Sequence, residues 1–155
     1  MGLHSFHLKW IAVLTMLIDH IGAVLFPGQM EFRIIGRMAF PIYCFLIVEG
    51  YTHTRDVQAY LKRLGIFALL SEIPYDLAFH GSLWDGSGQN VFLTLVLGVF
   101  MMDIIDKTDF WVGKALELFL VAGAAEFLNT DYGGKGIFLI FIYFALRNYR
   151  GAKLL

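Results

Sequence analysis

Hydrophobic residues along this chain gather into six long runs, which glycine, proline and polar residues separate. The runs show no sustained alternation of apolar and polar positions, whereas long apolar stretches that end at glycine or proline are typical of helices. We therefore expect an all-α protein with helices at about 8–26, 33–51, 63–80, 91–106, 110–128 and 135–149. No internal repeat is visible, and we expect a single domain over residues 1–155.

The composition indicates where these helices lie. Hydrophobic residues make up 58% of the chain and charged residues 16%, whereas a soluble domain has about 45–50% and ~25%. So few charges cannot cover a soluble globule, but six spanning helices of about 20 residues fit the length. The high content of aromatic residues excludes a disordered chain. We expect a polytopic integral membrane helix bundle of about six transmembrane helices, with the lipid bilayer as its surroundings.

The distribution of lysine and arginine predicts the orientation of this bundle. With six helices, both termini and the even-numbered loops share one side of the membrane. That side holds nine of the twelve basic residues, namely Lys9, Arg55, Lys62, Arg63, Lys107, Lys114, Arg147, Arg150 and Lys153. Because cytoplasmic loops carry an excess of basic residues, the N- and C-termini are both predicted to be cytoplasmic.

Charge and cysteine content exclude several other classes of protein. The net charge is −1 and no run of lysine or arginine forms a basic patch, so we expect no nucleic-acid partner. The single cysteine, Cys44, excludes an internal disulfide and is predicted to be a small core residue. The histidines show no metal-ligand spacing, and we expect no metal.

Ionisable residues inside the first two predicted helices are the main candidates for chemistry, because such groups are costly in a membrane. Lys9 and His20 are eleven positions apart, so they lie on one helix face, about 16 Å apart. Arg37 lies at a similar distance from the intervening turn as His20, where it can pair with Asp19 or lower the pKa of His20 by like-charge repulsion. A histidine held neutral at pH 7 is a competent general base. A polar cluster that only fixes helix packing fits this spacing equally well.

Several short motifs are spread over the chain from its start to about Gly136. They are Leu8-Lys9-Trp10-Ile11-Ala12, Met16-Leu17-Ile18-Asp19-His20-Ile21-Gly22, Arg33-Ile34-Ile35-Gly36-Arg37-Met38-Ala39-Phe40-Pro41-Ile42, Glu49-Gly50, His53-Thr54-Arg55, Ser71-Glu72-Ile73-Pro74-Tyr75, Asn90-Val91-Phe92-Leu93-Thr94-Leu95 and Asp131-Tyr132-Gly133. This combination resembles the TraX family. The resemblance implies an integral-membrane acyltransferase, because TraX proteins are associated with acetylation of the N-terminal amine of conjugative pilin.

The resemblance extends to a wider group of transmembrane acyltransferases, including acyltransferase family 3, which acetylate surface sugars. That group has a basic residue, ten spacers and a histidine in its first helix, and Lys9 and His20 match this spacing. It also has two arginines separated by two residues, where this chain has Arg33 and Arg37 separated by three. The family implies about two helices beyond those predicted here, and a multi-pass location in the bacterial inner membrane.

The resemblance also implies a mechanism, which is direct transfer of an acetyl group from acetyl-CoA. His20 would remove a proton from the acceptor, either the N-terminal amine of a pilin or a hydroxyl of a surface glycan. Arg37 and Arg33 would stabilise the developing oxyanion or hold the CoA phosphates. Asp19 would orient Arg37, and Lys9 would contact CoA.

Four further residues are candidate substrate contacts, each with a structural alternative. Glu49 and Glu72 either line the same cavity or pair with arginines of neighbouring helices. Asn90 is either a substrate contact or the N-cap of the helix that follows it. Asp131 either meets the acceptor or forms part of a turn.

A second class of function is a small membrane channel, carrier or assembly subunit. In such a protein the buried Asp19, His20, Arg37 and Glu49 would relay protons or hold the helices together. A carrier should have broken helices near the membrane midplane, for which Pro41 and Pro74 are the candidates. Short helices often need a second copy to enclose a path, so a homo-oligomer suits this alternative.

Overall fold

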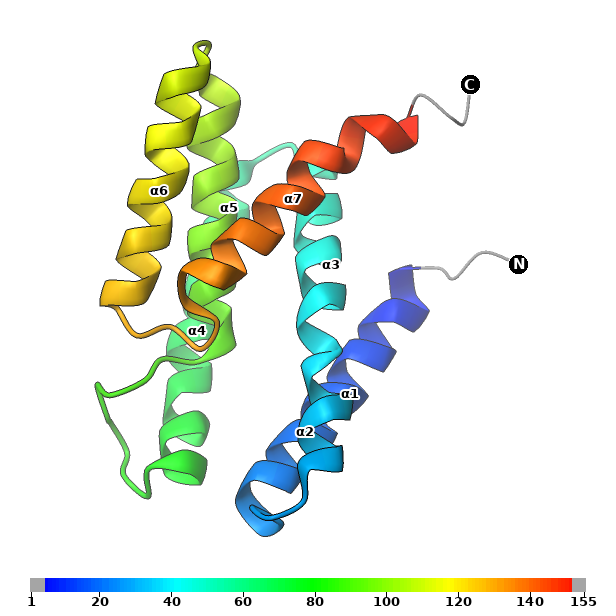
Figure 1. Ribbon diagram of the computed structural model, residues 1–155, viewed down its shortest axis with the longest axis vertical. Helices are drawn as coiled ribbons and strands as arrows, with labels where there is room; N and C mark the ends of the chain where they lie inside the picture. The colour runs from blue at the N-terminus through cyan, green and yellow to red at the C-terminus, as the bar shows by residue number, and fades with distance from the viewer. Residues whose placement is uncertain (1–4, 152–155) are drawn as a thin grey trace. The chain divides into compact units, whose positions relative to one another are not determined.

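The computed structural model describes residues 5–151, and among these it contains helices and no strand (Figure 1). The helices are α1 (Ser5–Leu25), α2 (Met30–Arg37), α3 (Ala39–His53), α4 (Val57–Phe79), α5 (Val91–Lys107), α6 (Trp111–Phe127) and α7 (Gly133–Gly151). The all-α prediction is therefore confirmed. The chain divides into two compact units that meet within α3, between Leu46 and Ile47, and each unit is described by itself.

The number of helices differs from the prediction because the expected segment 33–51 consists of two helices, α2 and α3. Pro41 accounts for the break, since its ring has no N–H to donate and clashes with the carbonyl four residues earlier, that of Arg37. Met38 at the break keeps a helical backbone, with φ −68° and ψ −19°. The chain therefore continues from α2 into α3 without reversing.

The first unit is built on a hairpin of α1 and α2, which pack through two glycines. A Cβ added at Gly36 would lie only 2.6 Å from the Cα of Asp19, and one added at Gly22 would overlap the Cβ of Phe32. Small residues at such positions let two helix backbones approach closely. Phe26 and Phe32 stack at the turn, with ring centroids 5.5 Å apart. The glycines therefore set the register between α1 and α2.

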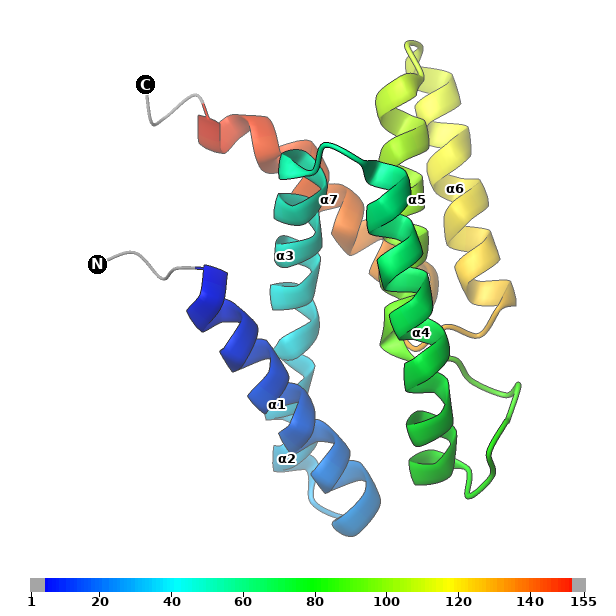
Figure 2. The same ribbon diagram turned by 180° about the vertical axis from the view of Figure 1, so that it is seen from behind.

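The second unit is organised around α5, which packs against α4, α6 and α7 (Figures 1 and 2). α5 buries a continuous set of side chains: Val91, Thr94, Leu95, Val99, Met101, Met102, Asp103 and Ile105. Gly98 allows close contact with α7, because a Cβ at this position would overlap Ile140. α5 is therefore the central helix of this unit.

The C-terminal part of α3 belongs to the second unit, where a small polar contact joins it to α5. The hydroxyl of Tyr51 lies 3.4 Å from the carbonyl of Met102 and 3.3 Å from Oδ2 of Asp106. The ring of Tyr51 packs edge-on against Phe144, and Arg147 of the same helix forms an ion pair of 2.7 Å with Asp106. α3, α5 and α7 are thus joined at one end.

Two features concern the lengths of the helices and their fit to a membrane. By length and composition, one helix of the described chain could cross a membrane: Phe6–Leu25, with mean hydropathy 1.7. α4 begins at Val57, six residues before the predicted segment, because Asp56 caps it by accepting a 2.9 Å hydrogen bond from the N–H of Ala59. The multi-pass arrangement and the cytoplasmic termini stay predictions.

Candidate functional site

The α1–α2 hairpin brings three of the predicted site residues together. Asp19 and Arg33 form an ion pair with 3.1 Å between Oδ2 and Nη1. The Asp19 side chain is 16% exposed and that of Arg33 37%. Oδ1 of Asp19 is buried without a hydrogen-bond partner. His20, which is half-buried, lies within electrostatic range of both charges.

The register of the hairpin explains why Arg33, and not Arg37, is the partner of Asp19. Gly36 lies directly against Asp19, so Arg33, one turn earlier on α2, reaches back to the carboxylate. Arg37 lies one turn beyond Arg33, at the last position of α2, and is exposed. The expected pairing of Asp19 with Arg37 is therefore wrong. The prediction assumed that residues at equal distances from the turn lie side by side. The close contact of Gly36 with Asp19 is not apparent from that count.

Lys9 lies on the same helix as His20, nearer its N-terminus, and is exposed. Its predicted role in CoA binding stays a prediction.

A second polar cluster lies in the other unit, between α4 and the start of α5. Glu72 and Asn90 are buried, with 4% and 3% of their surface exposed. The side-chain amide of Asn90 donates to Oε2 of Glu72 and, at 2.8 Å, to the carbonyl of Ala68. Its Oδ1 accepts a 2.9 Å hydrogen bond from the N–H of Phe92, so the predicted N-cap is confirmed. Asn90 thus caps α5 and joins it to α4.

Glu72 has an amide partner where an arginine was expected. Its second carboxylate oxygen, Oε1, is buried without a hydrogen-bond partner, as is the hydroxyl of Thr94, one turn after Asn90 on α5. Buried polar atoms without a partner are rare and call for an explanation, such as an unseen water or ligand. This part of the unit is therefore polar and incompletely satisfied.

Sequence reasoning missed a third group, formed by Asp76, His80 and Ser87. Asp76 is fully buried, and its Oδ1 lies 3.3 Å from Nδ1 of His80, one turn later on the chain. Nε2 of His80 lies 3.5 Å from the hydroxyl of Ser87 in the loop between α4 and α5. A signal was present, because Glu72, Asp76 and His80 recur every four residues and so share one helix face.

The two remaining candidates are Glu49 and Asp131, and neither is a member of the clusters described above. Oε2 of Glu49 is 3.8 Å from Nδ1 of His53 on the same helix, and its side chain is 44% exposed. The local histidine takes the place of the arginine partner expected for Glu49. Asp131 is exposed in the turn between α6 and α7, which agrees with the alternative that it forms part of a turn. That turn is tied to the loop before α5 by a bridge between Gln89 and Thr130.

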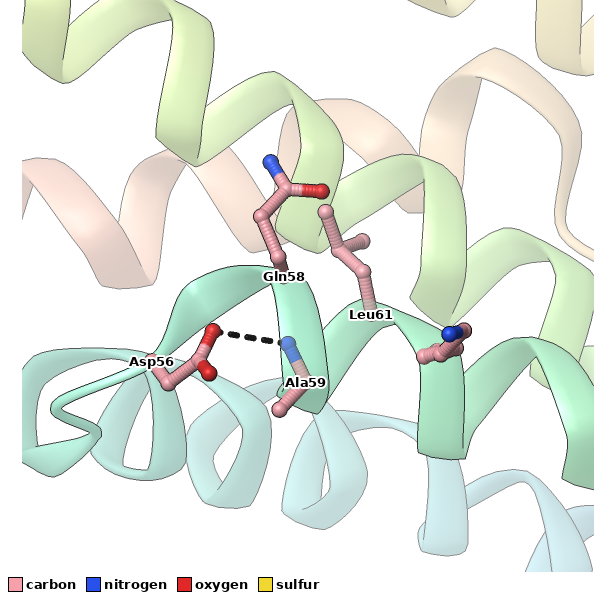
Figure 3. Close-up of a pocket in the computed structure, with 5 residues that line it drawn as sticks. Asp56, Gln58, Ala59 and Leu61 are labelled. Atoms are coloured by element: carbon pink, nitrogen blue, oxygen red, sulfur yellow. Dashed lines mark hydrogen bonds between the residues drawn. The ribbon is translucent and has the colours of Figure 1, made fainter.

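An open depression of about 570 Å³ lies at the start of α4 (Figure 3). Its lining consists of Asp56, Gln58, Ala59, Leu61 and Lys62. None of the candidate site residues lines it. Within the described part of the chain, no three histidine, cysteine, aspartate or glutamate side chains are grouped so as to hold a metal ion.

Comparison with known proteins places these clusters in a family. The model of the TraX protein family matches residues 5–154, nearly the whole chain. The chain belongs to the TraX family. The matched region includes the α1–α2 hairpin and the α4–α5 region, so both polar clusters are part of the family domain. No solved structure matches the chain.

Two curated proteins resemble parts of this TraX family chain. A probable fimbrial assembly protein FimC, serogroup H1, of Dichelobacter nodosus is 40% identical over 73 residues, which are 44% of this chain and 30% of that protein. An uncharacterized protein of Rickettsia prowazekii is 55% identical over 91 residues, which are 59% of this chain and 33% of that protein. The matches cover about a third of the length of these relatives.

Proposed function

We propose that this chain is a membrane-embedded acetyltransferase that acts in pilus assembly, with acetyl-CoA as donor and the N-terminal amine of a pilin as acceptor. One observation carries the proposal: in a chain of the TraX family, the α1–α2 hairpin holds His20 beside the Asp19–Arg33 ion pair. The fimbrial assembly relative supports the pilus context. A hydroxyl of a surface glycan is the alternative acceptor.

The outer surface of the second unit supports insertion in a membrane. The exposed positions of α6 include large apolar residues at helical spacing: Trp111, Val112, Leu116, Phe119, Leu120 and Phe127. α4 likewise exposes Ile66, Phe67, Leu69, Leu70, Ile73 and Leu77. A surface helix of a soluble protein would carry charged or polar residues on this face. Extended exposed apolar surface of this kind suits contact with lipid.

The proposed reaction is a direct acyl transfer. The acceptor amine attacks the carbonyl carbon of the thioester, and His20 takes the proton that the amine loses. The C–S bond then breaks, and the departing thiolate of CoA receives the proton from His20. Arg37, which is exposed and directly follows Gly36, the residue packed against Asp19, would stabilise the negative charge on the carbonyl oxygen.

The ion pair gives Asp19 a different role from the one predicted from the sequence, which was to orient Arg37. Because Asp19 engages Arg33, it holds that guanidinium against α1 and beside His20. A guanidinium held in this position would be available, with Arg37, to stabilise negative charge that develops near His20. Lys9, toward the start of α1, would contact the CoA portion of acetyl-CoA.

The test uses the chain in lipid vesicles, labelled acetyl-CoA and a pilin peptide with a free N-terminus. His20→Gln should lower the rate of acetyl transfer by ~10²–10⁴-fold, the usual contribution of a general base. His53→Gln is the matched control and should keep the wild-type rate, because this histidine is exposed and pairs with Glu49 of its own helix. The same peptide with an acetylated N-terminus should accept no label if the amine is the acceptor.

Binding of CoA distinguishes an acetyltransferase from a channel or carrier. The buried Glu72 and Asp76, on either side of Pro74, would suit a channel or carrier. CoA at ~100 times its dissociation constant should stabilise both wild type and His20→Gln by about 2.7 kcal/mol. Unchanged acetyl transfer by His20→Gln would remove His20 from the mechanism. Absence of both stabilisation and transfer in the wild type would favour the carrier.

A further inference from the structure

The group formed by Asp76, His80 and Ser87 has the connections of a nucleophile, a base and an orienting acid. Asp76 is fully buried, and both of its carboxylate oxygens are engaged. Oδ1 faces Nδ1 of His80 at 3.3 Å, and Oδ2 accepts a 2.7 Å hydrogen bond from the N–H of Asp85. The carboxylate is therefore held in place from two sides, and the side chain of His80, 25% exposed, is held by it.

This contact determines which nitrogen of His80 is free to take a proton. An ionised carboxylate only accepts hydrogen bonds, so a neutral His80 must present its N–H at Nδ1, toward Asp76. The lone pair is then on Nε2, which lies 3.5 Å from the hydroxyl oxygen of Ser87. Nucleophile–base contacts are often this long without substrate and shorten in the reacting complex.

The loop between α4 and α5 is folded so that Ser87 faces His80. Gly81 takes a left-handed backbone, φ 67°, where the loop leaves the helix. Oδ1 of Asp85 then accepts a 2.7 Å hydrogen bond from the N–H of Ser87, while the N–H of Asp85 is bound to Asp76. The loop is thus held at the serine and two residues before it.

Asp85 also accepts a hydrogen bond from the hydroxyl of Ser87, but it is a weaker base than His80. Hydrogen bonds from the side chain and the backbone of Ser87 lower the pKa of Asp85 below its usual value. A carboxylate with a lowered pKa is a poor acceptor of the serine proton, and an imidazole, with a usual pKa of ~6.5, is the stronger base. The group that can activate Ser87 is therefore His80.

We propose that Ser87 is an acyl-accepting nucleophile, with His80 as its general base and Asp76 as a positioning residue. Its substrate class is a small activated acyl group, and an acyl thioester as the natural donor rests on the function proposed above. The hydroxyl oxygen of Ser87 attacks the carbonyl carbon, and its proton passes to Nε2 of His80. The bond to the leaving group breaks, and the leaving thiolate takes the proton, which leaves an acyl ester on Ser87.

A second step would complete a transfer at this site, separate from the direct transfer proposed for His20. An acceptor amine attacks the ester carbonyl and loses its proton to His80, which passes it to the oxygen of Ser87 as the ester bond breaks. The ester allows the donor to leave before the acceptor arrives. Donor and acceptor then need not occupy the site together.

The first test measures reactivity of the full chain in lipid vesicles with a fluorophosphonate probe, which phosphonylates activated serines. Labelling of the wild type should map to Ser87 by peptide mass spectrometry. Ser87→Ala should abolish it, and His80→Ala should slow it by at least ~100-fold. Ser82→Ala is the matched control and should label at the wild-type rate, because Ser82 lies in the same loop and its hydroxyl makes no hydrogen bond to a described residue.

Two further readouts separate chemistry from a role of this group in anchoring the loop. Added imidazole should restore labelling of His80→Ala, which a loss of structure would not permit. Asp76→Asn should lower the maximal rate of labelling while the probe concentration that gives half of that rate stays unchanged, because the imidazole loses the carboxylate that holds its N–H at Nδ1. A wild type that does not react at probe concentrations that label a known serine hydrolase, or a label that persists in Ser87→Ala, overturns the proposal.

The donor is tested separately by incubation with acetyl-CoA, an acid quench and peptide mass spectrometry. An acetyl group on Ser87 that is absent from His80→Ala supports the thioester donor. A site that reacts with the fluorophosphonate but is never acetylated by acetyl-CoA overturns the thioester donor and leaves direct transfer by His20 as a separate question. Probe labelling does not depend on His20, so His20→Gln should label as the wild type does.

Discussion

At the scale of single residues, the Asp19–Arg33 ion pair decides how the first cluster is held. Both charges lie on the hairpin of α1 and α2, and one oxygen of Asp19 is buried without a hydrogen-bond partner. Removal of one member of a buried pair leaves an uncompensated charge and costs about 3–5 kcal/mol. Exposed pairs contribute only ~0–1 kcal/mol. With 37% of Arg33 exposed, the cost here lies between these limits.

We therefore expect Arg33→Met to lower the free energy of unfolding by about 1–3 kcal/mol, because Asp19 keeps its charge and loses its partner. The double variant Asp19→Asn with Arg33→Met should regain part of this loss, since no charge is left unpaired. Arg37→Met is the matched control on the same helix, and should change stability by less than ~0.5 kcal/mol because Arg37 is exposed. Denaturation in detergent micelles measures all three. Equal losses in Arg33→Met and Arg37→Met would contradict the importance of the pair.

The residues that could be predicted from the sequence are those whose environment is set by their own helix. Cys44 is buried and Asn90 caps α5, as expected. The partner of Asp19 could not be predicted, because it depends on the register between two helices. Ser87 was missed because its position is set by hydrogen bonds within an irregular loop. Its partner His80 was visible only as one of a set of residues spaced four apart.

At the scale of helices, glycine and proline determine where α1, α2 and α3 lie. Pro41 divides the predicted segment into two helices, whereas Pro74 lies inside an unbroken α4. The same residue type thus has two outcomes, and sequence alone does not distinguish them. The early start of α4 was missed because Gln58 and Lys62 interrupt the apolar run, although Asp56 is a typical N-cap residue.

Gly36→Ala should destabilise the hairpin, because the added methyl group would meet the backbone and side chain of Asp19. Overpacking of this kind usually costs about 1–3 kcal/mol. Gly123→Ala is the matched control, since a Cβ at this helical position on α6 meets nothing within 4 Å. It should be neutral or add ~0.5–1 kcal/mol, because alanine favours a helix over glycine. Thermal unfolding followed by circular dichroism compares the two. If Gly36→Ala were as stable as Gly123→Ala, the close contact of α1 and α2 would be refuted.

At the scale of the whole molecule, the distribution of polar and apolar side chains in the second unit supports the membrane location that we propose. In the second unit, Glu72, Asp76, Asn90 and Thr94 are buried, whereas large apolar side chains of α4 and α6 are exposed. In water this arrangement would bury polar groups and hydrate apolar ones, and both are unfavourable. In a bilayer the exposed apolar faces meet lipid, and the inward polar groups mark functional positions.

The predicted topology can be tested because the chain has one cysteine, Cys44, which is buried and can be replaced by alanine. In that background, single cysteines at Gln29 and Gly86 mark the loops expected outside, and those at Arg55 and Asp109 mark the loops expected in the cytoplasm. A membrane-impermeant maleimide added to intact spheroplasts should label the first two, and label Arg55→Cys and Asp109→Cys only after the membrane is permeabilised. The reason is the excess of lysine and arginine on the side of Arg55. If all four positions were labelled equally in intact cells, α3 to α5 would not cross the membrane, and the acceptor and donor would meet the chain from the same side.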